Sequence, residues 1–150
     1  MKQQGFTLIE LMVVLVIIGI ASAAISLTIK PDPLHLLRKD AERLSQLLQV
    51  AQAEARVDGR PITLRADAKG FRFSRRSDDG LGVDAFQGDA QLRPRLWEST
   101  PMQLNIEPRQ TLVLNAEWIN PPVRVVLSDG QHRLSLQRDA AGLMRVISQP

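Results

Sequence analysis

Glu10 is the side chain whose type and position most strongly indicate a specific chemistry, because it is a carboxylic acid inside an otherwise apolar stretch. The stretch runs from Phe6 to Ile29 and contains no other ionisable side chain. It is long enough for a helix to cross a hydrocarbon core of about 30 Å. There a carboxylate costs about 2.5–3.5 kcal/mol at the helix centre and less near an end. A cationic partner for Glu10 must therefore be a chain terminus, a lipid headgroup or another molecule. A position near the headgroups without a specific partner is the alternative.

A short basic leader precedes this stretch. Residues 1–5 include Lys2, and Phe6-Thr7-Leu8-Ile9-Glu10 follows directly. This arrangement resembles the class III signal of type IV pilins and of type II secretion pseudopilins. The resemblance implies that a prepilin peptidase cuts between Gly5 and Phe6 and that the new amino group of Phe6 is methylated. It also implies that Glu10 attracts the cationic N-terminus of a neighbouring subunit during assembly.

An ordinary secretory signal peptide has similar parts: a basic start, an apolar region and a small-residue cleavage site. Residues 21–23 (Ala-Ser-Ala) provide such a site, and cleavage there would release a soluble periplasmic domain beginning at Ala24. However, the apolar run continues past this site to Ile29, and Glu10 interrupts the apolar region. These features favour the pilin-like signal.

Three acids in a glycine-rich stretch raise a calcium hypothesis. Asp78, Asp79 and Asp84 lie between Ser77 and Gln91, where apolar residues are few, so a long surface loop is predicted. Calcium binds carboxylate and carbonyl oxygens, but this spacing does not match an EF-hand loop. A solvated loop is the simpler interpretation, and we predict no metal and no cofactor.

Arg133, Arg138 and Arg145 fall on the last two predicted strands. Basic residues of this kind hold the phosphates of DNA in nucleic-acid-binding proteins. Nearby acids dilute the positive charge, and no aromatic residue follows Trp118 to stack on bases. Scattered surface charge is therefore the preferred interpretation, and DNA binding is the alternative.

Groups that could perform catalysis are sparse. His35 and His132 lie far apart and without a companion motif, so each is expected on the solvated surface. The sequence contains no phosphate loop, zinc-ligand spacing or nucleophile elbow. Trp97 and Trp118 are interpreted as packing residues. The sequence therefore predicts a protein that is not an enzyme.

The remaining chain has the size of one domain. The 150 residues carry a net charge of +3 and no cysteine, so packing alone must stabilise the portion after Lys30. Pro31 and Pro33 predict a kink or short break after the apolar stretch. Beyond it, apolar residues recur at alternating steps of four and three, the period of one helix face: Leu37, Ala41, Leu44, Leu48, Ala51 and Ala55.

Polar residues between these positions, including Asp40 and Gln52, are expected on the water-facing sides of this amphipathic helix, which Asp58-Gly59 should end. The pattern then alternates. Ile62 and Leu64, a turn over residues 67–70, and Phe71 and Phe73 predict a β-hairpin. Further strands are predicted at Gln103–Ile106, Thr111–Leu114, Val123–Leu127, Arg133–Gln137 and Leu143–Ile147, with turns at Asp129-Gly130 and Ala141-Gly142.

This order predicts an α+β fold: a long N-terminal apolar helix continuing into an amphipathic helix packed on antiparallel sheets, a pilin-like small β-sandwich. Length, element order and residues 122–130 (Pro-Val-Arg-Val-Val-Leu-Ser-Asp-Gly) resemble the H-type minor pseudopilins of type II secretion. The resemblance implies a leader (1–5), a transmembrane and assembly helix (6–29) and a periplasmic domain (30–150). A type IV pilus minor pilin, with or without DNA binding, is the alternative within the superfamily.

The resemblance also implies a location and partners. The protein would be a single-pass protein of the bacterial inner membrane, with its C-terminal domain in the periplasm at or near the tip of a pseudopilus. Its partners would be other minor pseudopilins, the major pseudopilin, the prepilin peptidase and N-methyltransferase, the assembly platform, membrane lipid and exported substrates. Charge alone predicts the reverse orientation, because Lys2 precedes the apolar stretch and four basic residues follow it: Lys30, Arg38, Lys39 and Arg43.

Overall fold

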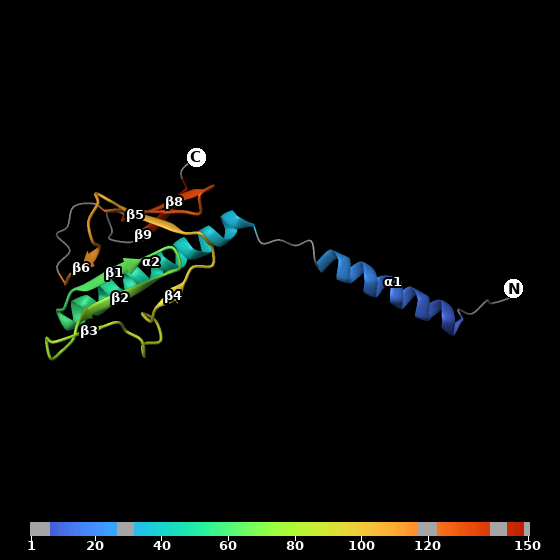
Figure 1. The fold of residues 1–150 in the computed structure, drawn as a ribbon, viewed down its shortest axis with the longest axis horizontal. Coiled ribbons are helices and arrows are strands. Elements are labelled where there is room, and N and C mark those ends of the chain that lie inside the picture. The colour runs from blue at the N-terminus through green and yellow to red at the C-terminus, as the bar shows by residue number, and fades with distance from the viewer. Residues whose placement is uncertain (1–6, 27–31, 117–122, 139–143, 149–150) are drawn as a thin grey trace. The chain divides into compact units, whose positions relative to one another are not determined.

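The computed structural model describes residues 7–26, 32–116, 123–138 and 144–148. The chain divides into two compact units, Met1–Asp32 and Pro33–Pro150. The first unit contains helix α1 (Leu8–Ser26), and the second contains helix α2 (Pro33–Asp58) and all described strands (Figure 1). Residues 27–31, which include Pro31, lie outside the described residues.

Helix α2 has the ends that its sequence favours. It begins at Pro33, one turn before Leu37, the first residue of the predicted apolar stripe. Asp32, directly before the helix, is not helical, which agrees with the predicted break, and a proline is well suited to the first helical position because no N–H bond is lost there. At the other end, the predicted stop is confirmed: α2 ends at Asp58, and Gly59 follows with a φ of 66°.

The predicted apolar face of α2 is buried. Two flanking residues, Asp40 and Gln52, are also buried, at 0% and 8% exposure, so the expectation that they face water was wrong. The physical reason is long-range hydrogen bonding, described below. The six stripe residues are each 0–2% exposed: Leu37, Ala41, Leu44, Leu48, Ala51 and Ala55.

The first sheet has the order β3-β2-β1-β6, with β4 also paired to β2. The predicted hairpin is confirmed: β1 and β2 pair from Ile62↔Arg75 to Ala66↔Phe71. The Asp67 N–H donates to the Gly70 carbonyl at 2.9 Å and closes the turn. The strands are β1 (Ile62–Ala66), β2 (Gly70–Arg76), β3 (Val83–Asp84), β4 (Arg95–Leu96) and β6 (Val113–Leu114).

The second sheet is fully antiparallel and has the order β5-β7-β8-β9. The predicted strands lie close to the observed ones, and Gly130, with a φ of 93°, lies in the predicted turn between β7 and β8. Leu143 and the turn at 141–142 lie outside the described residues. The strands are β5 (Gln103–Glu107), β7 (Arg124–Ser128), β8 (Arg133–Arg138) and β9 (Met144–Ser148).

Helix α2 and both sheets share one hydrophobic core. The helix contacts β1 and β6 of the first sheet and β7, β8 and β9 of the second (Figure 1). Phe73 and Leu136, one from each sheet, are both 0% exposed. The stretch from Ser77 to Gln91 is not only a surface loop, because it contains β3 and buries Phe86 at 5% exposure.

Candidate functional site

The N-terminal end of α1 is capped by its own sequence. Thr7 precedes the helix, and its Oγ1 accepts a hydrogen bond from the Glu10 N–H at 3.3 Å. The Thr7 carbonyl accepts the first helical hydrogen bond, from the Leu11 N–H, at 3.2 Å. Thr and Glu three residues apart at a helix start have the spacing of a capping box. The cap observed here is the Thr7 half of that motif, in which the Glu10 backbone N–H is the donor, and sequence reasoning missed it.

The Glu10 carboxylate is exposed and has no hydrogen-bond or ion-pair partner among the described residues. An acid in the first turn is stabilised by the positive end of the helix dipole. The carboxylate is therefore positioned at the helix start and available to a cation from another molecule. Gly5 and Phe6, the predicted cleavage and methylation residues, lie outside the described residues.

The side chains of α1 form an apolar surface. Large apolar residues from Leu8 to Ile20 are 45–78% exposed within this unit. An apolar surface of this extent indicates a site of contact with another apolar partner. Among the helices that the structure describes, none has both the length and the apolar composition needed to cross a membrane.

The three acids of the predicted calcium loop do not converge. The Asp78 carboxylate pairs with Arg60, Asp84 Oδ2 lies 3.3 Å from Arg75 Nε, and Asp79 Oδ1 accepts the Leu81 N–H at 3.0 Å. Each carboxylate therefore has a separate partner. Among the described residues, no cluster of three or more acidic, histidine or cysteine side chains could hold a metal ion.

Two residues singled out in the sequence, His132 and Trp97, have local structural contacts. His132 Nδ1 lies 3.0 Å from Asp129 Oδ2 in the turn between β7 and β8. Burial alone would raise the pKa of Asp129, but hydrogen bonds from the His132 N–H, the His132 ring and the Gln131 N–H together lower it. Trp97 packs as predicted: it is 5% exposed, its ring centroid lies 4.5 Å from that of Phe71, and Trp118 lies outside the described residues.

Three buried polar residues of α2 bind distant segments. Asp40 Oδ2 accepts the backbone N–H groups of Glu98 at 2.9 Å and Ser99 at 2.8 Å. Ser45 Oγ donates to the Met144 carbonyl of β9 at 3.0 Å. The Gln52 side chain donates to the carbonyl of Asn115, just after β6. Their position beside the apolar stripe was the sequence signal that could have indicated their burial. Their partners could not be predicted from it, because they lie 58 or more residues away.

The arginines predicted on the second sheet are placed as expected on its last two strands, with Arg133 and Arg138 on β8 and Arg145 on β9. Arg133 lines a groove that sequence reasoning did not anticipate. This groove has a volume of about 1080 Å³ and lies between the β1–β2 hairpin and strands β5, β7 and β8. We call it the inter-sheet groove.

The fold and the N-terminal segment define a class of protein, one with an N-terminal apolar helix followed by a pilin-like α+β domain. The model of the prokaryotic N-terminal methylation motif matches residues 1–26. The fold is similar to that of the minor pseudopilin EpsH from the Type 2 Secretion System of Vibrio cholerae. The TM-score is 0.56 at 18% sequence identity, and the match covers 75% of this chain and 96% of that one.

The model of the type II transport protein GspH matches residues 40–142. This chain therefore belongs to the GspH family, which confirms the predicted H-type assignment. Type II secretion system protein H of Aeromonas hydrophila is 33% identical over 91 residues, which are 59% of this chain and 49% of that protein. The chain thus spans about half the length of this relative.

Proposed function

We propose that this chain is a minor pseudopilin that acts as a structural subunit at or near the tip of the periplasmic pseudopilus and supports protein export by type II secretion. One observation carries the proposal: the methylation motif and the GspH family match occur in this order in one chain, at residues 1–26 and 40–142. The exposed apolar surface of α1 supports a role in helix-mediated assembly. The proposed role is structural rather than catalytic.

In this proposal, residues 6–29 anchor the protein in the inner membrane, and residues 30–150 form its periplasmic domain. A prepilin peptidase and N-methyltransferase would cleave after Gly5 and methylate Phe6. Glu10 would then pair with the cationic N-terminus of an adjacent subunit. The major pseudopilin, the other minor pseudopilins, the assembly platform and exported substrates are the proposed partners.

Mass spectrometry of the mature N-terminus tests this proposal. We expect a chain that begins at methylated Phe6. A chain beginning at Ala24 would instead establish secretory cleavage and release, and an uncleaved Met1 would exclude processing as a pilin. Deletion of the gene should then abolish export of type II substrates and leave type IV piliation intact, whereas the reverse phenotype would assign the chain to a pilus.

A further inference from the structure

The inter-sheet groove has a strongly basic lining. Among the residues that the structure describes, two acids line it, Asp67 and Glu107. Its six basic residues come from both walls: Arg65, Lys69 and Arg72 from the hairpin of the first sheet, Arg109 from the connection after β5, and Arg124 and Arg133 from the second sheet.

Most of this positive charge is not neutralised by the residues that the structure describes. Among the described residues, Arg124 is the only one of the six with a carboxylate within 4.0 Å, that of Glu107. The Asp67 carboxylate instead accepts the N–H groups of Lys69 and Gly70 at 2.8 and 2.9 Å. By contrast, Arg75 of β2, which does not line the groove, has the carboxylates of three residues within 4.0 Å. The groove therefore presents a positive surface to an external anion.

Arg65 and Arg72 provide a second, independent indication of an anionic ligand. They lie directly opposite each other in the β1–β2 pair, and both are exposed and line the groove. Like charges at directly opposite positions destabilise a sheet. An anion bound between the two guanidinium groups would remove that repulsion.

One wall of the groove is a sheet edge. Strand β5 pairs with β7 on one side only, and its backbone forms no other hydrogen bond with the described residues. In an antiparallel strand, alternate residues direct their N–H and C=O groups to opposite sides. Part of the β5 backbone therefore lies unpaired along the groove, as edge strands do when they accept an added strand.

The size and lining of the groove restrict the kind of ligand. Its volume of about 1080 Å³ is at the upper limit of small-molecule pockets, roughly 300–1,000 Å³, so a chain segment fits better than a small anion. Phe71 is the aromatic residue in its lining and is 3% exposed. Sites for single-stranded nucleic acids combine a positive groove with aromatic side chains on which the bases stack. These features favour a polypeptide.

We propose that the inter-sheet groove binds an extended, acidic polypeptide segment that adds a strand to β5 and places its carboxylates against the groove arginines. The segment belongs to a partner protein. This inference does not depend on the proposed function, because it concerns the binding properties of the folded domain and is tested without assembly or secretion.

The test uses the full-length chain in a zwitterionic detergent and a fluorescently labelled ten-residue peptide of alternating Glu and Val. Fluorescence anisotropy at low salt should show binding that weakens as salt is added. A peptide with Lys in place of Glu should bind at least about tenfold more weakly. A peptide of the same charge with every backbone nitrogen methylated cannot donate hydrogen bonds to a strand edge from either of its sides, and it should also bind at least about tenfold more weakly.

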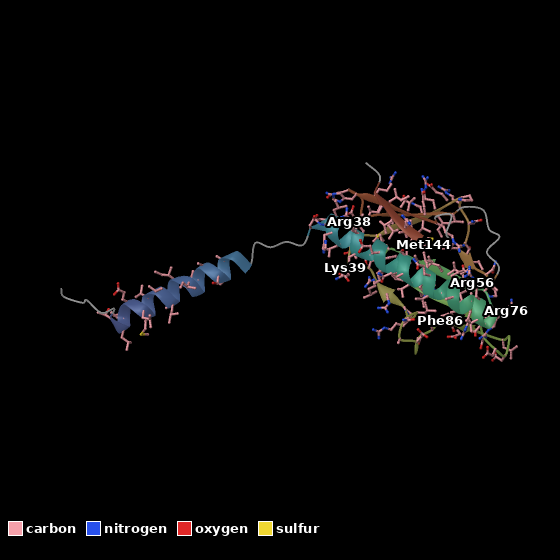
Figure 2. The ribbon with its side chains drawn as sticks, turned by 180° about the vertical axis from the view of Figure 1, so that it is seen from behind. Arg38, Lys39, Arg56, Arg76, Phe86 and Met144 are labelled. Carbon is pink, nitrogen blue, oxygen red and sulfur yellow. The ribbon has the colours of Figure 1, made fainter. Side chains whose placement is uncertain are left out.

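Arg65→Glu separates binding from folding. It should weaken binding of the acidic peptide by about tenfold or more without lowering the melting temperature, because the introduced carboxylate lies opposite Arg72 and replaces repulsion with attraction. Arg38→Glu makes the same charge change at an exposed position of α2 that does not line the groove (Figure 2). This control should leave affinity within about twofold of the unmodified chain.

Three outcomes would overturn the proposal. The first is equal binding of the acidic and basic peptides. The second is an affinity for Arg65→Glu that equals that of Arg38→Glu. The third is binding of a single-stranded oligonucleotide at the groove without binding of the acidic peptide, which would assign the groove to nucleic acid.

Discussion

A single carboxylate shows how a charged residue is accommodated in this core. Asp40 is fully buried, yet it accepts two backbone N–H groups and lies 2.6 Å from Arg43 Nη2. Arg43 also donates to the Leu96 carbonyl at 2.9 Å. Charge-assisted hydrogen bonds offset the cost of removing the carboxylate from water. Asp40 thus fixes the chain after β4 to α2.

Replacement of Asp40 by Asn should lower the free energy of unfolding by about 2–4 kcal/mol, because an amide N–H₂ then faces groups that are themselves donors. Urea unfolding followed by circular dichroism measures this change. Glu42→Gln is the matched control on the same helix, and because Glu42 is exposed it should change stability by less than about 0.5 kcal/mol. Similar losses for both variants would contradict the role of Asp40.

Glu10 contributes its backbone N–H to the cap of α1, and in our proposal its carboxylate pairs with a neighbouring subunit. Glu10→Gln and Glu10→Ala both retain the cap, because Thr7 binds the Glu10 backbone N–H, and both remove the charge, while Glu10→Gln also keeps the side-chain size. If charge pairing drives assembly, both variants should be cleaved after Gly5 and both should fail to enter the pseudopilus, as measured by shearing and immunoblotting. Normal incorporation of Glu10→Gln would refute the pairing role.

Turn carboxylates should make the domain sensitive to acid. The backbone N–H groups of Leu92 and Gln91 hold the pKa of Asp89 below its ordinary value of 3.8, and those of Lys69 and Gly70 do the same for Asp67. The native state therefore binds fewer protons than the unfolded state near pH 4, so this stabilisation is complete above the unfolded pKa and is lost as the pH falls through the folded one.

These two carboxylates should accordingly cause little change in the melting temperature between pH 7 and about pH 5. At pH values under about 4, the melting temperature should decrease. Asp89→Asn retains an acceptor for both N–H groups but cannot titrate, so its melting temperature should fall less on acidification. Differential scanning calorimetry from pH 3 to pH 7 measures both curves. An equal fall of the melting temperature at low pH in both proteins would show that Asp89 does not contribute to the acid sensitivity.

At the scale of elements, the local periodicity of apolar residues was sufficient to predict a helix or strand where the buried residues lie close together in the sequence. The stripe from Leu37 to Ala55 and the alternation in the β1–β2 hairpin predicted helix and strands directly. The stretch around Phe86 was misjudged, because its burial depends on a distant element: Arg75 of β2 lies over the ring, 4.8 Å from its centroid. Phe86 also has a φ of 54°, a conformation unusual for a bulky residue.

The pairing of β4 with β2 depends on the absence of a side chain at Gly70. A Cβ atom there would overlap the Arg95 carbonyl oxygen and lie 3.2 Å from its carbon. Gly70→Ala should therefore destabilise the domain by about 1–3 kcal/mol and speed amide exchange in β4. Gly88→Ala, where a Cβ meets nothing within 4 Å, is the control and should be nearly neutral in thermal unfolding.

At the scale of the whole molecule, the N-terminal motif and the element order were enough to predict the family, because both lie in contiguous stretches of sequence. The inter-sheet groove could not be predicted in the same way. Its basic residues are spread from Arg65 to Arg133, and their proximity depends on how two sheets pack against one helix. Long-range packing likewise determined the partners of Asp40 and Gln52.

The three polar contacts of α2 have a mechanical consequence. Asp40, Ser45 and Gln52 attach the helix to the β4–β5 connection, to β9 and to the end of β6, and the first and last are separated by about 18 Å along the helix axis. A pulling force along the axis of α2 therefore loads all three hydrogen-bonded contacts at the same time, because they lie at different positions along the helix. The helix and its two sheets should move as one rigid body under load, which is the property that the proposed role in a pseudopilus requires.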